Sequence, residues 1–174
     1  MPDIRDFVES IVDSYKFDWF VTLGYVPWRH RSCRADIKKK HIFDRFRELP
    51  PEPFSPEDRK KMRSNAEECF FQWWDDIQQC PPTGPGVSDM LWLEEYRPDG
   101  KILFHVLIAK FNGFEDVWER RWIEISHGWA RTRTIGDRIA GFICYMVMKV
   151  GCVLRVNCSE FKGTYTALDF FGGW

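Results

Sequence analysis

The stretch MLWLEEYRPDGKILFHVLIAK, residues 90–110, decides the fold that we expect for this chain. Its two arms, Met90 to Tyr96 and Lys101 to Lys110, are rich in the aliphatic and aromatic residues that are typical of buried strands. Between the arms, the turn RPDG at residues 97–100 contains a proline and a glycine, which favour a tight reversal of the chain. The stretch therefore predicts an antiparallel β-hairpin.

Helices and further strands are predicted on both sides of this hairpin. Ser55 is a typical N-cap and Pro56 suits the first helical turn, so a long helix should run from there to about Gln79. Apolar spacing elsewhere predicts helices at Ile4–Tyr15, Glu115–Ser126 and Asp137–Lys149, and strands at Trp19–Tyr25, Trp129–Ile135 and Cys152–Val156. The tail from Phe161 to Trp174 either covers a sheet edge or forms a contact surface. The order of elements predicts one α+β domain over residues 1–174, with a central antiparallel β-sheet flanked by helices.

The composition excludes several classes of protein. Hydrophobic residues make up 44% of the 174 residues and aromatic residues 17%, which excludes a disordered chain. The net charge of −1 counts mildly against a nucleic-acid-binding role. Six cysteines without a C-x-x-C pair, and an N-terminus without an apolar signal core, favour reduced thiols in a cytoplasmic protein. No apolar run reaches the roughly 20 residues of a membrane span, and no glycine-rich loop predicts a small-molecule cofactor.

Three motifs follow one another along the chain: FVTLG at residues 20–24, EYRPDGKILFHVLI at 95–108 and AGFICYMVMK at 140–149. In order and spacing they resemble the motifs of rolling-circle replication initiators of phages and plasmids, the HUH-endonuclease or Rep-like family. The resemblance implies a single HUH-endonuclease/RRM-like domain that binds single-stranded or hairpin DNA. If the protein is active, it implies a metal-dependent DNA nicking endonuclease that uses a tyrosine.

Two positions depart from the family's pattern. Leu103 stands where the first metal-binding histidine is expected, and Phe142 stands where the nucleophilic tyrosine is expected. The resemblance then implies a weak Mn²⁺ or Mg²⁺ site with Glu95 and His105 as its protein ligands. Tyr145, one helical turn after Phe142, is the candidate substitute nucleophile.

Each of these residues also has a plain structural interpretation. Lys149 stands where the family often has a lysine, but a lysine is also favoured near any helix C-terminus. Tyr145 in an apolar helix is more often a packing residue, and a single histidine on an apolar strand is often a hydrogen-bonded core residue. One of the adjacent Glu94 and Glu95 should face solvent, as most carboxylates do.

Basic and aromatic residues give the candidate nucleic-acid contacts. Arg29 and Arg31 belong to a basic stretch, and Arg131 and Arg133 alternate on a predicted strand, so that both lie on one face. Arginines placed in this way contact phosphates, although a solvated strand face is an equally good interpretation. Most of the tryptophans are expected in the core, while some are candidates for base stacking.

Three hypotheses about function follow. The one that we favour is a replication-initiator-like protein that binds single-stranded or hairpin DNA, with nicking reduced or lost. The alternative is a catalytically dead initiator fold, repurposed by a phage or plasmid to bind and inhibit or regulate another protein or nucleoprotein complex, for example as an anti-defence inhibitor. The third is a metal-dependent nuclease that uses His105 and Glu95 with water in place of tyrosine.

Overall fold

The computed structural model describes residues 3–27, 54–79, 89–109, 115–136 and 138–171 of the chain. The basic stretch with Arg29 and Arg31 lies outside the described residues. Within the described part of the chain, no helix has the length and apolarity needed to cross a membrane.

The strands form one antiparallel sheet in the order β4-β1-β3-β2-β5-β6. Strand β3 (Ile102–Ala109) lies at the centre, between β1 (Phe17–Tyr25) and its hairpin partner β2 (Met90–Tyr96). The outer strands are β4 (Trp129–Thr134) on one side and β5 (Val153–Asn157) with β6 (Lys162–Tyr165) on the other. The predicted α+β class, with a central antiparallel sheet flanked by helices, is confirmed.

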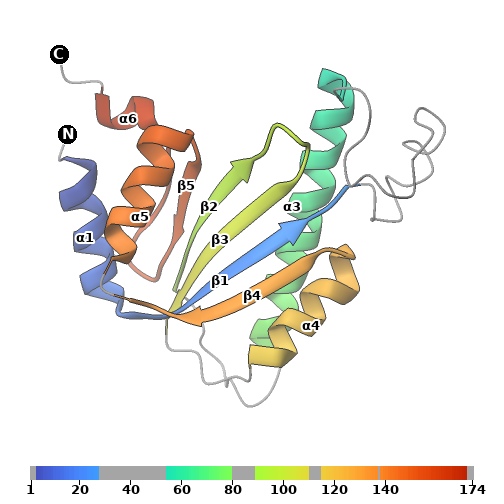
Figure 1. Cartoon of the computed structure of the whole chain (residues 1–174). Helices are drawn as coiled ribbons and strands as arrows, with labels where there is room; N and C mark the ends of the chain where they lie inside the picture. The colour runs from blue at the N-terminus through green and yellow to red at the C-terminus, as the bar shows by residue number, and fades with distance from the viewer. Residues whose placement is uncertain (1–2, 28–53, 80–88, 110–114, 137, 172–174) are drawn as a thin grey trace.

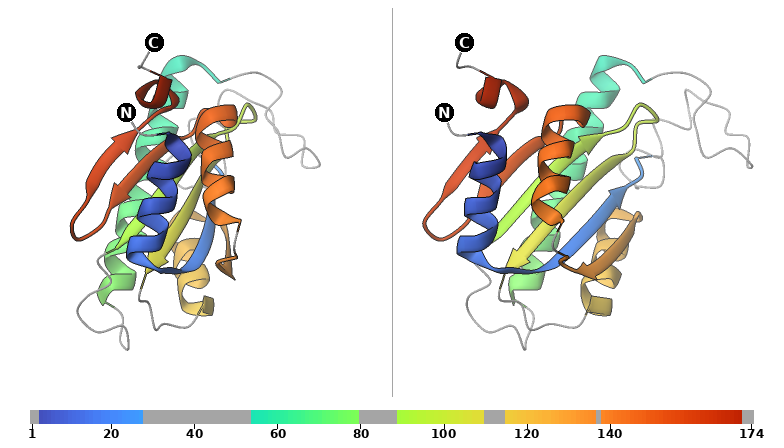
Figure 2. Two further views of the ribbon diagram at one scale, coloured as in Figure 1. Left: turned by 90° about the vertical axis from the view of Figure 1, so that its left-hand side faces the viewer. Right: turned by 60° about the vertical axis from the view of Figure 1, so that its left-hand side comes forward.

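Helices pack on both faces of the sheet (Figures 1 and 2). One face is covered by α3 (Pro56–Gln79) and α4 (Glu115–Ser126). The other face carries α1 (Ile4–Tyr15), α5 (Ile139–Tyr145) and the short α6 (Ala167–Phe171), gathered over the β2, β3 and β5 part of the sheet. Strands β1 and β4 lie to one side of these helices, and β4 forms the edge of the sheet opposite to β6.

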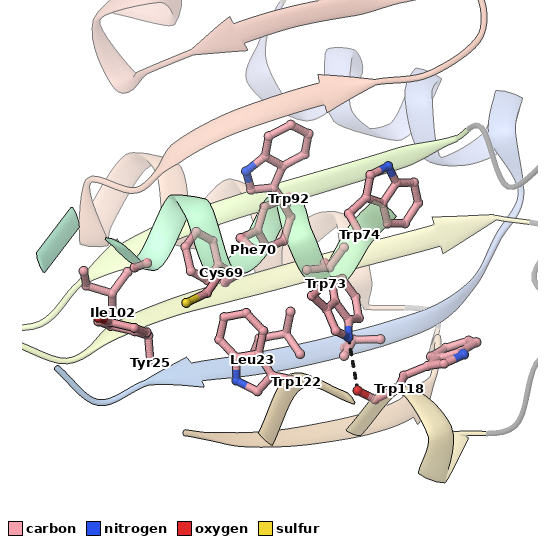
Figure 3. Close-up of a cluster of buried hydrophobic side chains, with 14 of the residues drawn as sticks. Leu23, Tyr25, Cys69, Phe70, Trp73, Trp74, Trp92, Ile102, Trp118 and Trp122 are labelled. Atoms are coloured by element: carbon pink, nitrogen blue, oxygen red, sulfur yellow. Dashed lines mark hydrogen bonds between the residues drawn. The ribbon is translucent and has the colours of Figure 1, made fainter. Parts of the chain in front are cut away.

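Tryptophans dominate the core between α3, α4 and the sheet (Figure 3). Trp73 and Trp122 are fully buried, and the Nε1 of Trp73 donates a hydrogen bond of 3.1 Å to the carbonyl oxygen of Trp118. The indole of Trp122 donates a hydrogen bond of 3.2 Å to the carbonyl oxygen of Gly24 in β1. The core role predicted for most tryptophans is therefore confirmed, and Trp129 differs because it is 39% exposed.

The last predicted helix differs in its C-terminal part. Helix α5 ends at Tyr145 and continues as a π-helical turn, η1 (Met146–Val150), before Gly151 at φ +80° ends the element. A π turn contains more residues than an α turn, so it rotates the side chains that follow relative to a regular helix. Lys149 lies on this turn with an exposed side chain.

The tail that the sequence left unassigned extends the sheet. Its residues form β6, which pairs with β5, and α6, which follows directly. Phe7 of α1 contacts three aromatic rings of this region, those of Phe161, Tyr165 and Phe170. Of the two expectations for the tail, coverage of the sheet edge is the one that the structure confirms.

Candidate functional site

The candidate site lies on the sheet face that carries α5, where β1 runs between β3 and β4. Thr22 of β1 pairs with His105 of β3 on one side and with Arg131 of β4 on the other. Directly opposed residues of antiparallel strands have their side chains on the same face. The next row of partners toward the β3 N-terminus joins Trp129, Gly24 and Leu103. Leu103 and His105 therefore lie on one face of the sheet.

A carboxylate and a hydroxyl hold the imidazole of His105. Glu95 of β2 accepts a hydrogen bond from His105 Nε2 at 3.0 Å, and the hydroxyl of Thr22 lies 3.4 Å from Nδ1. The expectation that Glu94 or Glu95 faces solvent is wrong, because their side chains are 2% and 19% exposed. The reason is pairing: His105 partners one carboxylate, and two arginines, Arg63 and Arg155, partner the other.

Two phenylalanines enclose the same imidazole. The ring of Phe20 stacks on that of His105, with centroids 6.0 Å apart and planes 7° apart. Phe142 of α5 approaches with its edge, at 5.5 Å and 78°. The helix therefore brings Phe142, which has no hydroxyl, to His105.

The structure does not bring the two predicted catalytic residues to His105. The side chain of Tyr145 is 58% exposed, and neither Tyr145 nor Lys149 is among the residues that line the cavity beside the imidazole. The π turn after Tyr145 also changes the direction of Lys149. Catalytic roles for both residues stay predictions.

A cavity of about 680 Å³ opens beside the imidazole. Phe20, His105 and Phe142 form one wall, and the cavity reaches Trp129 and Arg133 on β4. The ring of Trp129 lies directly over Gly24, where a β-carbon would come within 2.2 Å of the indole, so the glycine makes room for it.

Arg138 also lines this cavity, and sequence reasoning missed it. The residue is the N-cap of α5 and makes no side-chain capping bond. A positive charge at a helix N-terminus opposes the helix dipole. No signal in the sequence indicated this position beside the cavity, because the predicted helix began at Asp137 and placed Arg138 inside it rather than at its N-cap.

The donors present fit a divalent metal incompletely. Among the described residues there is no group of three or more His, Cys, Asp or Glu side chains that is placed to hold a metal ion. Glu95 and His105 are hydrogen-bonded to each other, and Leu103, which also lines the cavity, supplies no donor atom. Mn²⁺ and Mg²⁺ prefer a larger set of oxygen or imidazole ligands. The metal therefore stays a prediction, and we derive no chemical step from it.

Burial of His105 has a consequence for the pH dependence of stability. Desolvation lowers the pKa of His105 below its usual 6.5, and the hydrogen bond and charge of Glu95 oppose this effect without reversing it. The unfolded chain therefore takes up a proton at this residue at a higher pH than the folded chain does. Stability falls as the pH drops below about 6.5, because protons favour the unfolded state there.

We expect the wild type to lose more stability than His105→Gln when the pH is lowered from about 7.5 to about 5.5. Urea denaturation of both proteins at the two pH values measures this difference, and groups common to both proteins cancel. An equal loss in the two proteins would show that His105 does not titrate in this range.

The cavity is thus lined by His105, three aromatic rings, Arg133 of β4 and Arg138 at the α5 N-terminus, and Glu95 is hydrogen-bonded to that histidine. The register also places Arg131 and Arg133 on this face, as predicted from their alternation. Comparison of the chain with protein-family models, with curated proteins and with solved structures finds no match.

Proposed function

We propose that this chain is a replication-initiator-like protein with an HUH-endonuclease/RRM-like arrangement, and that it binds single-stranded or hairpin DNA with nicking reduced or lost. The observation that carries the proposal is the face of β4. Trp129, Arg131 and Arg133 occupy alternate positions there, beside the cavity that Phe142 and His105 line.

This arrangement has the chemistry that a single strand requires. An aromatic ring supports a base by stacking, which contributes about 1–3 kcal/mol per base and depends little on sequence. Trp129 offers such a ring on this face, because its side chain is 39% exposed. Guanidinium groups contact the phosphates on either side of a stacked base. The net charge of −1 is compatible with this role because the positive charge is local, on β4 and at the start of α5.

The same geometry supports reduced or absent nicking. A nucleophile must lie within reach of the phosphate that the site positions. Phe142 occupies the position beside His105 and has no hydroxyl, while Tyr145 is exposed away from the cavity. Leu103, unlike a histidine, adds no metal ligand to the histidine–glutamate pair.

The double variant Arg131→Ala/Arg133→Ala should weaken binding of single-stranded DNA. Each lost phosphate contact lowers the slope of log K against log salt by about 0.7 for a single strand, so the slope should fall by about 1.4. Fluorescence anisotropy with a labelled oligonucleotide at several salt concentrations measures both quantities. The same samples with Mn²⁺, run on a denaturing gel, should show neither cleavage nor a covalent adduct.

The control is Arg120→Ala/Lys162→Ala, which removes two exposed cations from α4 and β6. It should retain the affinity and salt slope of the wild type. If both double variants bind DNA equally well, the arginines of β4 do not contact it.

The alternative function stays a prediction. It is a catalytically dead initiator fold that binds and inhibits or regulates another protein or nucleoprotein complex, as an anti-defence inhibitor would. The presence of Phe142 in place of a tyrosine and of Leu103 in place of a histidine is equally compatible with this function. Wild-type protein that is folded and does not bind single-stranded or hairpin DNA would favour it. A cytoplasmic location and a water-dependent nuclease activity of His105 and Glu95 also stay predictions.

A further inference from the structure

A second cavity, of about 340 Å³, lies on the other side of the sheet, between α3 and the β2–β3 hairpin. Its floor contains Met62 and Ile102, each 3% exposed. Its walls carry five cationic side chains, those of Arg59, Lys60, Arg63, Arg97 and Lys101, and none of the described residues that line it is acidic. We call it the α3 cavity. Its volume falls at the lower end of the range of small-molecule sites, about 300–1,000 Å³.

A buried carboxylate fixes one wall of the α3 cavity. Glu94 is 2% exposed and accepts hydrogen bonds from the hydroxyl of Tyr96 at 2.8 Å and from Arg63 at 3.3 Å. The guanidinium carbon of Arg63 lies 4.8 Å from the centroid of the Tyr96 ring. Arg155 also pairs with Glu94, at 2.6 Å. Tyr96 and Arg63 are thus held in position before any ligand arrives, which lowers the cost of binding.

The hairpin turn fixes the opposite wall. Gly100 has φ +81°, and a β-carbon there would come within 2.3 Å of the Phe54 ring, so the turn packs closely against the chain before α3. The backbone N–H of Arg97 donates to the carbonyl oxygen of Lys101 at 2.9 Å. The side chain of Asp99 lies near both cations, at 4.0 and 3.3 Å. This turn sets where Arg97 and Lys101 stand relative to α3.

The charge and shape of the α3 cavity select its ligand. Cations that line a partly enclosed cavity favour an anion, and guanidinium groups in particular favour phosphate. The first three turns of α3 contribute Arg59, Lys60 and Arg63. The apolar floor and the partly exposed ring of Tyr96 suit the flat apolar face of a ring system that is linked to that phosphate.

We propose that the α3 cavity binds a nucleotide through its terminal phosphate, with the base against the apolar floor and the Tyr96 ring. The phosphate can belong to a free nucleotide or to the phosphorylated end of a strand, because both present the same group. The proposal does not rest on DNA binding at β4, since the two cavities share no residue and lie on opposite faces of the sheet.

Isothermal titration of the full chain with deoxyadenosine monophosphate, deoxyadenosine and inorganic phosphate tests this site. We expect the nucleotide to bind about tenfold or more tightly than either fragment, because only it makes both the phosphate and the ring contacts. Lys60→Ala/Arg97→Ala should weaken nucleotide binding by about tenfold or more. Both side chains belong to exposed positions, so the variant should fold.

The matched control is again Arg120→Ala/Lys162→Ala, which should bind the nucleotide as the wild type does. Arg131→Ala/Arg133→Ala should also retain it, which separates a failure of this proposal from a failure of DNA binding at β4. Short oligonucleotides with a 5′-phosphate or a 5′-hydroxyl distinguish the two sources. Both are titrated into Arg131→Ala/Arg133→Ala, so that β4 does not contribute. Tighter binding of the 5′-phosphorylated strand than of both the 5′-hydroxyl strand and the free nucleotide assigns the site to strand ends, and tighter binding of the free nucleotide assigns it to free nucleotides.

Two results would overturn the proposal. One is the absence of nucleotide binding at millimolar concentration by folded wild-type protein. The other is equal binding of deoxyadenosine and its monophosphate, which would show that the cations do not recognise the phosphate.

Discussion

Replacement of Trp122 by alanine should lower the free energy of unfolding by about 3–5 kcal/mol, as truncation of a fully buried tryptophan does. Trp122 is 0% exposed and joins α4 to the sheet. Its ring contacts those of Trp73 and Phe104 edge to face, with centroids 6.4 and 6.0 Å apart. The variant would lose these contacts, leave a cavity and remove the donor that bonds the Gly24 carbonyl.

Urea denaturation followed by tryptophan fluorescence measures this loss. Trp129→Ala is the matched control: that side chain is 39% exposed, so its removal should cost clearly less than removal of the fully buried Trp122. The effects on DNA binding should be reversed, since Trp129 is the proposed platform for base stacking and Trp122 is fully buried. Similar losses of stability in the two variants would contradict the assignment of Trp122 as the link between α4 and β1.

Glu94→Ala should destabilise the protein by about 3 kcal/mol, the lower end of the cost of breaking a buried charge pair. Removal of the carboxylate leaves Arg63 and Arg155 with Glu67 as their remaining counter-ion, at 3.0 and 3.8 Å. Their side chains are 44% and 29% exposed, so water recovers part of the loss. Tyr96 would also lose the acceptor of its hydroxyl.

Thermal or urea denaturation checks this expectation against two further variants. Glu94→Gln retains an acceptor oxygen and should cost less than the alanine. Glu9→Ala removes a carboxylate that pairs with Arg5 across one turn of α1, where both side chains are well exposed, and should change the stability little. If Glu94→Ala is no more costly than Glu9→Ala, the buried carboxylate does not organise this part of the fold.

Local signals in the sequence were sufficient for most of the elements. The N-cap at Ser55 and the apolar spacing after it predicted α3 from Pro56 to Gln79, and the turn at residues 97–100 predicted the hairpin. The π turn after Tyr145 was not predictable in this way, because an apolar segment has the same spacing signal whether its last turn is α or π. Strand β6 was missed because KGTY is too short and too polar to stand out, and it becomes a strand by pairing with β5.

The candidate site was predictable where the arrangement depends on residues of a single strand. Alternation alone placed Arg131 with Arg133 on one face of β4. What the sequence could not predict depends on contacts between distant elements. Glu94 is buried because arginines of α3 and β5 meet there, and the α3 cavity exists because a helix and a hairpin turn present their cations to the same space.

The strand order has a consequence for the chain as it leaves the ribosome. The two neighbours of β1 are β3 and β4, and those of β2 are β3 and β5, so all of them are synthesised after residue 101. An early nascent chain therefore carries β1 before any of its partner strands has been made. The pairs that form later join residues as distant in sequence as Thr22 and His105. Such non-local pairing slows folding and leaves apolar edges open to other chains meanwhile. Synthesis of β3 is the event that converts two isolated strands into a sheet.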